Sequence, residues 1–140
     1  MIDAAVVDAS VGIKLFIQEE GSAEADQLFA RLADSPPVRF YVPDLFFIEC
    51  ANILWKYVRH FGYPAESALG DIVDLRELDL SSISTSDLLP LALELALDFN
   101  ITAYDACYVA LAQQVNLPLV TADTSLARSL EGSGVEVIIL

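Results

Sequence analysis

Short apolar runs alternate with longer segments of helical periodicity along the whole chain. The apolar runs predict buried strands at 4–7, 39–42, 78–83, 117–121 and 135–139. Apolar residues spaced three and four apart predict helices at about 10–18, 23–33, 44–61, 64–78, 86–99, 102–115 and 123–130. Alternating strands and helices favour a parallel sheet covered on both faces. The pattern therefore predicts an α/β fold of three layers, α/β/α, around a central parallel sheet of about five strands.

The predicted helices begin at residues that cap helices well. Ser10, Asp44, Thr102 and Asp123 stand at or just before the first apolar position of their helices. Their side-chain oxygens can accept hydrogen bonds from the free backbone N–H groups of a first turn. We therefore expect Ser10 to cap a first helix that runs to about Gln18, and Asp44 to cap the long helix that follows the second strand.

Length and composition predict a single domain that spans residues 1–140. The chain is 55% hydrophobic, yet charged residues interrupt every apolar run before the ~20 residues that a membrane span needs. We expect no signal peptide and no membrane segment, and we expect a cytoplasmic protein. The surplus of apolar residues predicts a thick core together with a subunit interface, so a homodimer is expected.

The chain is strongly acidic, with 21 Asp plus Glu against 7 Lys plus Arg and a net charge of −14. Nucleic-acid-binding proteins usually carry basic patches, and an acidic protein repels phosphate at long range. A nucleic-acid substrate would therefore depend on a local groove and on bound cations. The same charge suits a basic protein partner.

Four acidic residues stand where their segments should approach one edge of the predicted sheet. Asp8 ends the first strand, and Asp123 follows the strand at 117–121. Glu49 lies in the first turns of the helix after the second strand, and Asp105 lies in the first turn of the helix at 102–115. Capping alone would explain Asp8, Asp105 or Asp123 individually. Glu49 is harder to explain in this way, because it interrupts a dense apolar stretch where an unpaired charge is costly.

A cluster of these four acids would need cations. Two carboxylates ~5 Å apart repel each other by roughly 3 kcal/mol at an effective dielectric constant near 20. Hard divalent ions such as Mg²⁺ or Mn²⁺ prefer carboxylate oxygens, and a metal held in this way activates water and stabilises charge on a phosphate. The carboxylates therefore indicate a metal-dependent reaction at a phosphate.

Four blocks of the chain resemble the motifs of one enzyme family. They are Val7 to Ser10, Pro43 to Asn52, Tyr104 to Ala112, and Val120 to Asp123. In order and spacing they are similar to the motif blocks of PIN-domain ribonucleases, and most similar to the VapC-type toxins of toxin–antitoxin pairs. The resemblance covers nearly the whole chain.

The resemblance implies a metal-dependent endonuclease that cleaves RNA and is inhibited by a cognate antitoxin with a basic tail. It implies that the catalytic, metal-binding residues are Asp8, Glu49, Asp105 and Asp123, with Mg²⁺ or Mn²⁺ as the cofactor. It also implies supporting roles for Ser10 and Thr121. Some family members carry a further acid shortly after the fourth Asp, where this chain has Thr124 and Ser125.

Three basic residues are candidates for holding the RNA backbone, namely Lys14, Lys56 and Arg59. Alternative hypotheses remain at this point. The chain could be a catalytically silent PIN-like module that acts through protein contacts, or a PIN nuclease of RNA processing that is not a toxin. A haloacid-dehalogenase-like phosphatase would need a second Asp where Ser10 stands, and a response-regulator receiver would need paired early acids and a late Lys.

Overall fold

The computed structural model describes residues 2–140, and its centre is a five-stranded parallel sheet. The strands are β1 (Ala4–Val7), β2 (Arg39–Pro43), β3 (Leu80–Ile83), β4 (Leu119–Thr121) and β5 (Val137–Ile139). Their order across the sheet is β3-β2-β1-β4-β5, and every neighbouring pair is parallel. The predicted parallel sheet of about five strands is confirmed.

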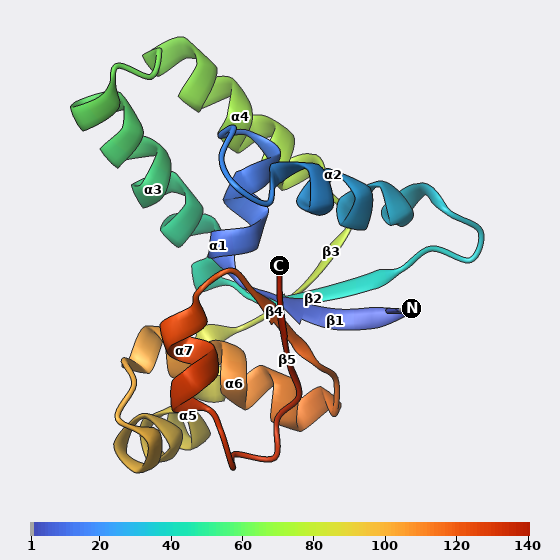
Figure 1. Ribbon diagram of the computed structural model, residues 1–140, viewed down its shortest axis with the longest axis vertical. Helices are drawn as coiled ribbons and strands as arrows, with labels where there is room; N and C mark the ends of the chain where they lie inside the picture. The colour runs from blue at the N-terminus through green and yellow to red at the C-terminus, as the bar shows by residue number, and fades with distance from the viewer. Residues whose placement is uncertain (1) are drawn as a thin grey trace.

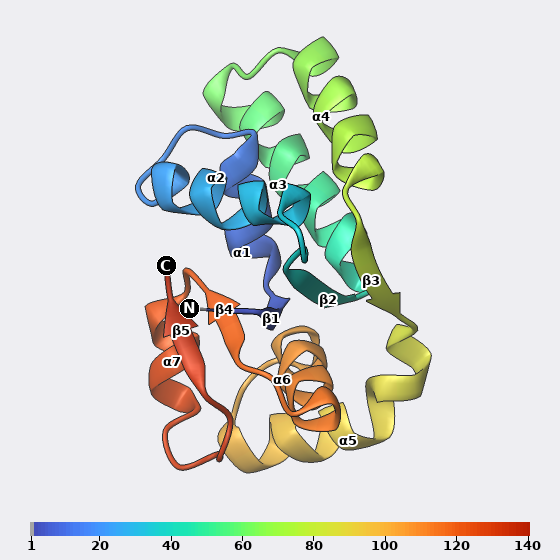
Figure 2. The same ribbon diagram turned by 90° about the vertical axis from the view of Figure 1, so that its right-hand side faces the viewer.

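Helices cover both faces of this sheet (Figures 1 and 2). They are α1 (Ala9–Gly12), α2 (Ser22–Ala30), α3 (Leu45–Phe61), α4 (Ala65–Glu77), α5 (Thr85–Phe99), α6 (Ala103–Val115) and α7 (Thr124–Ser129), with short 3₁₀ helices η1 (Ile13–Leu15) and η2 (Arg31–Ala33). Helices α1 to α4 lie on one side and α5 to α7 on the other, and the α3–α4 hairpin extends beyond the sheet (Figure 2). The three-layer α/β/α fold follows from this arrangement.

Strand β1 runs through the middle of the core. Its residues alternate between the two layers: Ala5 and Val7 pack in the cluster that contains α2, whereas Val6 packs in the cluster that contains α6. All three side chains are fully buried. A strand that is buried on both faces is apolar throughout, and a carboxylate at its end is therefore placed at the edge of the core.

Two of the predicted helix caps, Ser10 and Asp44, make no cap hydrogen bond, and the first helix also begins at another residue than predicted. The first helix begins at Ala9 instead of Ser10, and beyond Gly12 it tightens into η1, which ends at Leu15 rather than Gln18. Ser10 bonds to a neighbouring carboxylate and caps nothing. Asp44 occupies the N-cap position of α3 but makes no side-chain cap bond. Hydrogen-bond partners elsewhere in the fold compete for these side chains, and the periodicity of the sequence does not reveal which partners those are.

Asp44 instead joins the start of α3 to the start of α5. Its Oδ1 accepts hydrogen bonds from the backbone N–H of Thr85, at 2.9 Å, and from the Thr85 hydroxyl. The Leu45 N–H in turn donates to Thr85 Oγ1 at 3.2 Å. The Thr85 hydrogen bonds lower the pKa of Asp44 below its ordinary value, since they favour the ionised carboxylate. The contact fixes the entry of α3, the helix that carries Glu49.

Candidate active site

The four predicted acids all lie near the carboxyl edge of the sheet. Asp8 directly follows β1, and Asp123 follows β4, the strand beside it. Glu49 begins the second turn of α3, which leaves the end of β2. Asp105 lies in the first turn of α6, a helix that precedes β4 and therefore begins near this edge. Ligands of open parallel sheets bind at this edge, because the connections diverge there.

Asp8 is held by two hydroxyl groups. Ser10 Oγ and Thr121 Oγ1 each donate to Asp8 Oδ2, both at 2.8 Å. The Asp8 residue is 7% exposed and Thr121 is fully buried. A buried carboxylate that accepts two hydrogen bonds on one oxygen has a single preferred orientation. The end of β1 therefore presents a fixed carboxylate.

The same two hydroxyl groups connect β1 to the loop after β4. The Ala122 N–H donates to Ser10 Oγ at 3.0 Å, and the Asp123 N–H donates to Thr121 Oγ1 at 3.1 Å. The Ser10 and Thr121 oxygens lie 3.3 Å apart. This network determines where the backbone of Asp123 lies relative to Asp8. The carboxylate of Asp123 also caps α7, accepting from the Leu126 N–H at 3.0 Å, so the capping interpretation is correct for Asp123.

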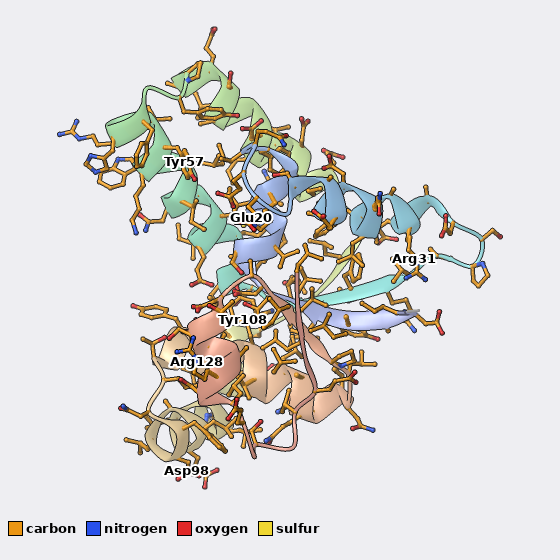
Figure 3. All side chains as sticks on the ribbon, in the orientation of Figure 1. Glu20, Arg31, Tyr57, Asp98, Tyr108 and Arg128 are labelled. Carbon is orange, nitrogen blue, oxygen red and sulfur yellow. The ribbon has the colours of Figure 1, made fainter. Side chains whose placement is uncertain are left out.

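Glu49 has one strong partner, and sequence reasoning missed it. The hydroxyl of Tyr108 donates to Glu49 Oε1 at 2.5 Å, and Tyr108 itself is fully buried in α6 (Figure 3). The signal was present in the sequence, because a tyrosine on a fully apolar helix face must find a partner for its hydroxyl group. A glutamate within an apolar stretch likewise needs a hydrogen-bond donor for its carboxylate.

Asp105 differs from the other acids in its contacts. Its backbone N–H donates to Thr102 Oγ1 at 3.1 Å, so Thr102 is the N-cap of α6, as predicted. The Asp105 side chain is half-buried. Capping of α6 by Thr102 thus fixes the backbone of Asp105 and leaves its carboxylate beside the other acids.

The charges of these acids act on one another. Burial raises the pKa of Asp8, of Glu49 and of Asp105 above their ordinary values, and in each case it is the largest cause. The neighbouring carboxylates add to this rise: Asp123 acts on Asp8, Asp8 and Asp105 act on Glu49, and Asp8 and Asp123 act on Asp105. Mutual repulsion of this kind shows that the four groups share one electrostatic environment.

The sequence and the fold match one known family and its members. Residues 5–129 match the family described as PIN domain. Ribonuclease VapC3 of Pyrobaculum aerophilum is 36% identical over 124 residues, which cover 87% of this chain and 91% of that protein. The chain is a PIN-domain protein of the VapC type. The family resemblance of the four sequence blocks is thereby confirmed.

Solved structures agree on the fold of this PIN domain. The crystal structure of PAE2754 from Pyrobaculum aerophilum superimposes with a TM-score of 0.70 at 24% identity, covering 97% of this chain and 83% of that one. A toxin–antitoxin complex from Klebsiella pneumoniae gives a TM-score of 0.65 at 18% identity, covering 96% and 95%. At these identities the likeness shows the fold alone.

No basic residue in the described part of the PIN domain forms an ion pair with the four acids. Among residues 2–140 the ion pairs are Lys14–Glu19, Arg31–Asp3 and Arg31–Asp34, and none includes a site acid. Mutual repulsion among the acids is therefore not relieved by an ion pair within the described chain. This is the electrostatic setting in which a bound cation is most favourable.

Lys14 does not have the surface position expected of an RNA contact. It is 8% exposed, and its Nζ donates to Glu19 Oε1 at 3.0 Å and to the Glu20 carbonyl at 2.5 Å. Tyr57 donates to the other oxygen of Glu19 at 3.0 Å. The structure therefore assigns Lys14 to the packing of η1 against α3. Lys56 and Arg59 are exposed on α3 and stay predictions.

The described chain offers few groups of side chains that could bind a metal ion. Within residues 2–140, no three Asp, Glu, His or Cys side chains are grouped so that they could hold one ion together. The acids gather at one edge without forming a closed cage of the kind expected of a structural zinc site. Mg²⁺ differs, because it keeps several waters and is usually held by one or two carboxylates together with substrate phosphates. The donor set fits that mode of binding.

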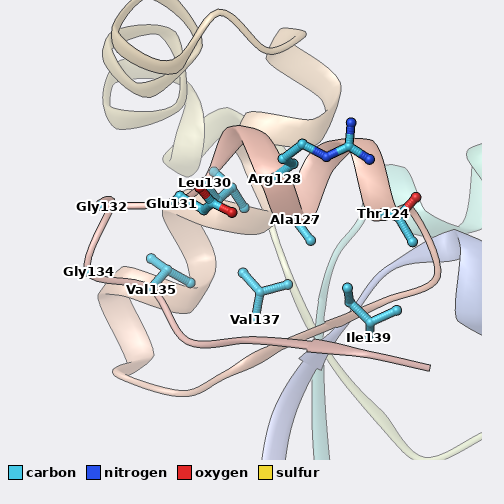
Figure 4. Close-up of a pocket in the computed structure, with 10 residues that line it drawn as sticks. All are labelled: Thr124, Ala127, Arg128, Leu130, Glu131, Gly132, Gly134, Val135, Val137 and Ile139. Atoms are coloured by element: carbon cyan, nitrogen blue, oxygen red, sulfur yellow. The ribbon is translucent and has the colours of Figure 1, made fainter.

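Three cavities of the described chain lie near this region. The first, of about 410 Å³, is lined by Ile48, Glu49, Asn52 and Tyr104. The second, of about 370 Å³, is lined in part by Ser10 and Ala122. The third, of about 530 Å³, lies between α7 and the segment leading into β5 (Figure 4). Of these three, only the first is lined by one of the four acids.

None of the helices in residues 2–140 is long and apolar enough to cross a membrane.

Proposed function

We propose that this PIN domain is a metal-dependent endoribonuclease that serves as the toxin of a type II toxin–antitoxin pair. The observation that carries the proposal is the buried Asp8 carboxylate, which two hydroxyl groups orient at the end of β1. The Asp123 charge raises the pKa of Asp8, and the Asp8 charge in turn raises the pKa of Glu49 and of Asp105. The relative VapC3 is a ribonuclease. Together they support hydrolysis of phosphodiester bonds in RNA.

In this proposal Asp8, Glu49, Asp105 and Asp123 bind a divalent ion, Mg²⁺ or Mn²⁺, one or two of them directly and the others through water molecules of the ion. All four side chains offer carboxylate oxygens, the donors that such hard ions prefer. When bound, the ion would lower the pKa of a water molecule and stabilise charge on the phosphate.

The protein's own residues then prepare the site before substrate arrives. Ser10 and Thr121 hold Asp8, and Tyr108 holds Glu49, so neither carboxylate has to be reorganised during the reaction. Lys56 and Arg59, exposed on α3, are proposed to contact the RNA backbone. Their positive charge would offset part of the repulsion between an acidic protein and phosphate.

An antitoxin is the proposed protein partner. The toxin–antitoxin complex from Klebsiella pneumoniae shares this fold. A net charge of −14 and an acidic site favour a basic inhibitory segment, since opposite charges speed association and set specificity. A homodimer is also proposed: Leu89, Leu93 and Leu97 are exposed at four-residue intervals on α5 and form an apolar stripe. We expect the pair to act in the cytoplasm.

The test is cleavage of total RNA by the purified protein with Mg²⁺, with Mn²⁺ and with EDTA. The Asp8→Asn variant should lose cleavage and should bind Mn²⁺ more weakly in calorimetric titration. Asp98→Asn is the matched control, because Asp98 is exposed at the far end of α5 (Figure 3). RNA that stays intact with the wild type and both ions would favour the silent interaction module. Cleavage by a protein that co-purifies with no inhibitory partner would favour a PIN nuclease of RNA processing.

A further inference from the structure

The cavity beside Glu49 has a composition that the proposed reaction does not explain. It has a volume of about 410 Å³ and is lined by Ile48, Glu49, Asn52 and Tyr104. Ile48 is 69% exposed and Tyr104 is 67% exposed. Large apolar side chains are usually withdrawn from water, and exposed ones that gather at a pocket mark a binding surface. The pocket adjoins the acids directly, because Glu49 lines it and Tyr104 precedes Asp105.

The lining of this pocket favours a flat, uncharged ligand. Tyr104 offers an aromatic ring, Ile48 an aliphatic side chain, and Asn52 an amide that both donates and accepts hydrogen bonds. The charged residue in the lining is Glu49, an acid, so a phosphate group is disfavoured there. An unpaired nucleobase has the matching chemistry: it stacks on aromatic rings and presents donors and acceptors on its edges.

We propose that this pocket is a nucleobase subsite that holds one unpaired base of the RNA beside the phosphate to be cleaved. Tyr104 stacks on the base, Ile48 packs against it, and Asn52 forms hydrogen bonds with its edge. This inference rests on the proposed function and names how that site selects its substrate. In a protein with a net charge of −14, contacts to uncharged bases supply affinity that phosphate contacts cannot.

The surface of α3 continues from this pocket as a path for the RNA backbone. Ile48, Asn52, Lys56 and Arg59 follow one another at intervals of four, four and three residues, so they share one face of the helix. All four are exposed. Lys56 stands about 6 Å along the helix from Asn52, a little more than one turn. A chain whose base occupies the pocket would therefore pass the two basic residues as it leaves the acids.

The first test measures binding of a short, fluorescently labelled single-stranded RNA in EDTA, where cleavage stops. Loss of one stacking partner weakens such binding by about 5- to 150-fold, so Tyr104→Ala should show a decrease in this range. Tyr104→Phe keeps the ring and should bind like the wild type. Phe61→Ala is the control, because Phe61 is an exposed aromatic residue (74%) at the far end of α3.

The second test maps cleavage positions with Mn²⁺. Tyr104→Ala should raise KM and leave kcat close to the wild-type value, as expected for an interaction made equally in the ground and transition states. Asn52→Ala should relax the preference for one base at the position next to the cleaved bond. Substitution of Phe61 should change neither quantity.

Failure of this inference is distinguishable from failure of the proposed function. A wild-type protein that cleaves RNA, together with a Tyr104→Ala variant that binds and cuts identically, would overturn the subsite and leave the nuclease intact. In that case the exposed ring and Ile48 belong to a protein-binding surface. A wild-type protein that does not cleave RNA would overturn the nuclease, and the binding arm in EDTA would still decide whether Tyr104 holds a base.

Discussion

Removal of the Tyr108 hydroxyl should uncouple Glu49 from the protein core with little change in packing. Tyr108→Phe keeps the ring, which is fully buried in α6, and removes the group that donates to Glu49 Oε1 at 2.5 Å. The substitution creates no large cavity, since only one oxygen atom is lost. Its consequences should therefore report on the hydrogen bond itself.

The size of the effect follows from the charge of the acceptor. Hydrogen bonds to ionised groups contribute about 1.5–3 kcal/mol. Glu49 is half-buried, so water can replace part of the lost interaction, and we expect a loss of about 1.5 kcal/mol in the free energy of unfolding near neutral pH. If the bond also holds Glu49 in its reactive orientation, kcat should fall by roughly 10- to 150-fold.

The pH dependence has a definite sign. Burial raises the pKa of Glu49 above 4.5, and the Tyr108 hydrogen bond opposes that rise. Without the donor the folded-state pKa is higher still. Because a raised carboxyl pKa means that ionisation disfavours the fold, stability falls as pH rises from 4.5 through the folded-state pKa. The additional loss in the free energy of unfolding caused by Tyr108→Phe should therefore reach its full size above that pKa. It should disappear at lower pH, where Glu49 is protonated.

Urea unfolding across this pH range and pH–rate profiles of RNA cleavage measure both effects. The acidic limb of the rate profile should move to higher pH in Tyr108→Phe. Tyr63→Phe is the matched control: Tyr63 also donates to a carboxylate, that of Asp71 on α4, which raises the pKa of Tyr63 to about 12. An unchanged rate and unchanged profile in Tyr108→Phe would refute a positioning role for the hydroxyl group.

Three further predictions concern other parts of the chain. Asp105→Asn should raise the metal-free melting temperature at neutral pH and abolish cleavage, because it removes a carboxylate whose pKa is raised by burial and by neighbouring acids. A lower melting temperature in scanning calorimetry would contradict strong repulsion among the acids. Lys14→Met should destabilise the fold by about 1–3 kcal/mol, since it leaves Glu19 without its buried cation, and equal stability in urea would contradict this. Gly12→Ala should cost about 1–3 kcal/mol, because a Cβ there would meet the Phe46 ring at 2.6 Å, and a melting temperature equal to that of the wild type would show that the ring moves freely.

Much of the fold was determined by local sequence signals. The apolar run at 4–7 forms the buried strand that its pattern predicts, and Thr102 caps α6 as its residue type predicts. The alternation of strands with helices then required a parallel sheet. Acids at the ends of strands were expected at one edge for the same topological reason.

What the sequence left undecided was the choice of partner for each polar side chain. Ser10 and Asp44 are good helix caps in isolation, yet Ser10 Oγ accepts from the Ala122 N–H and Asp44 Oδ1 accepts from the Thr85 N–H, 112 and 41 positions away in the chain. Lys14 is of a residue type that usually lies on the surface, yet it is buried and forms an ion pair with Glu19. Tyr108 bonds to a carboxylate 59 positions away in the chain. Periodicity and capping depend on neighbours within one turn, so they determine the elements, whereas a hydrogen bond between distant side chains exists only after the layers have packed.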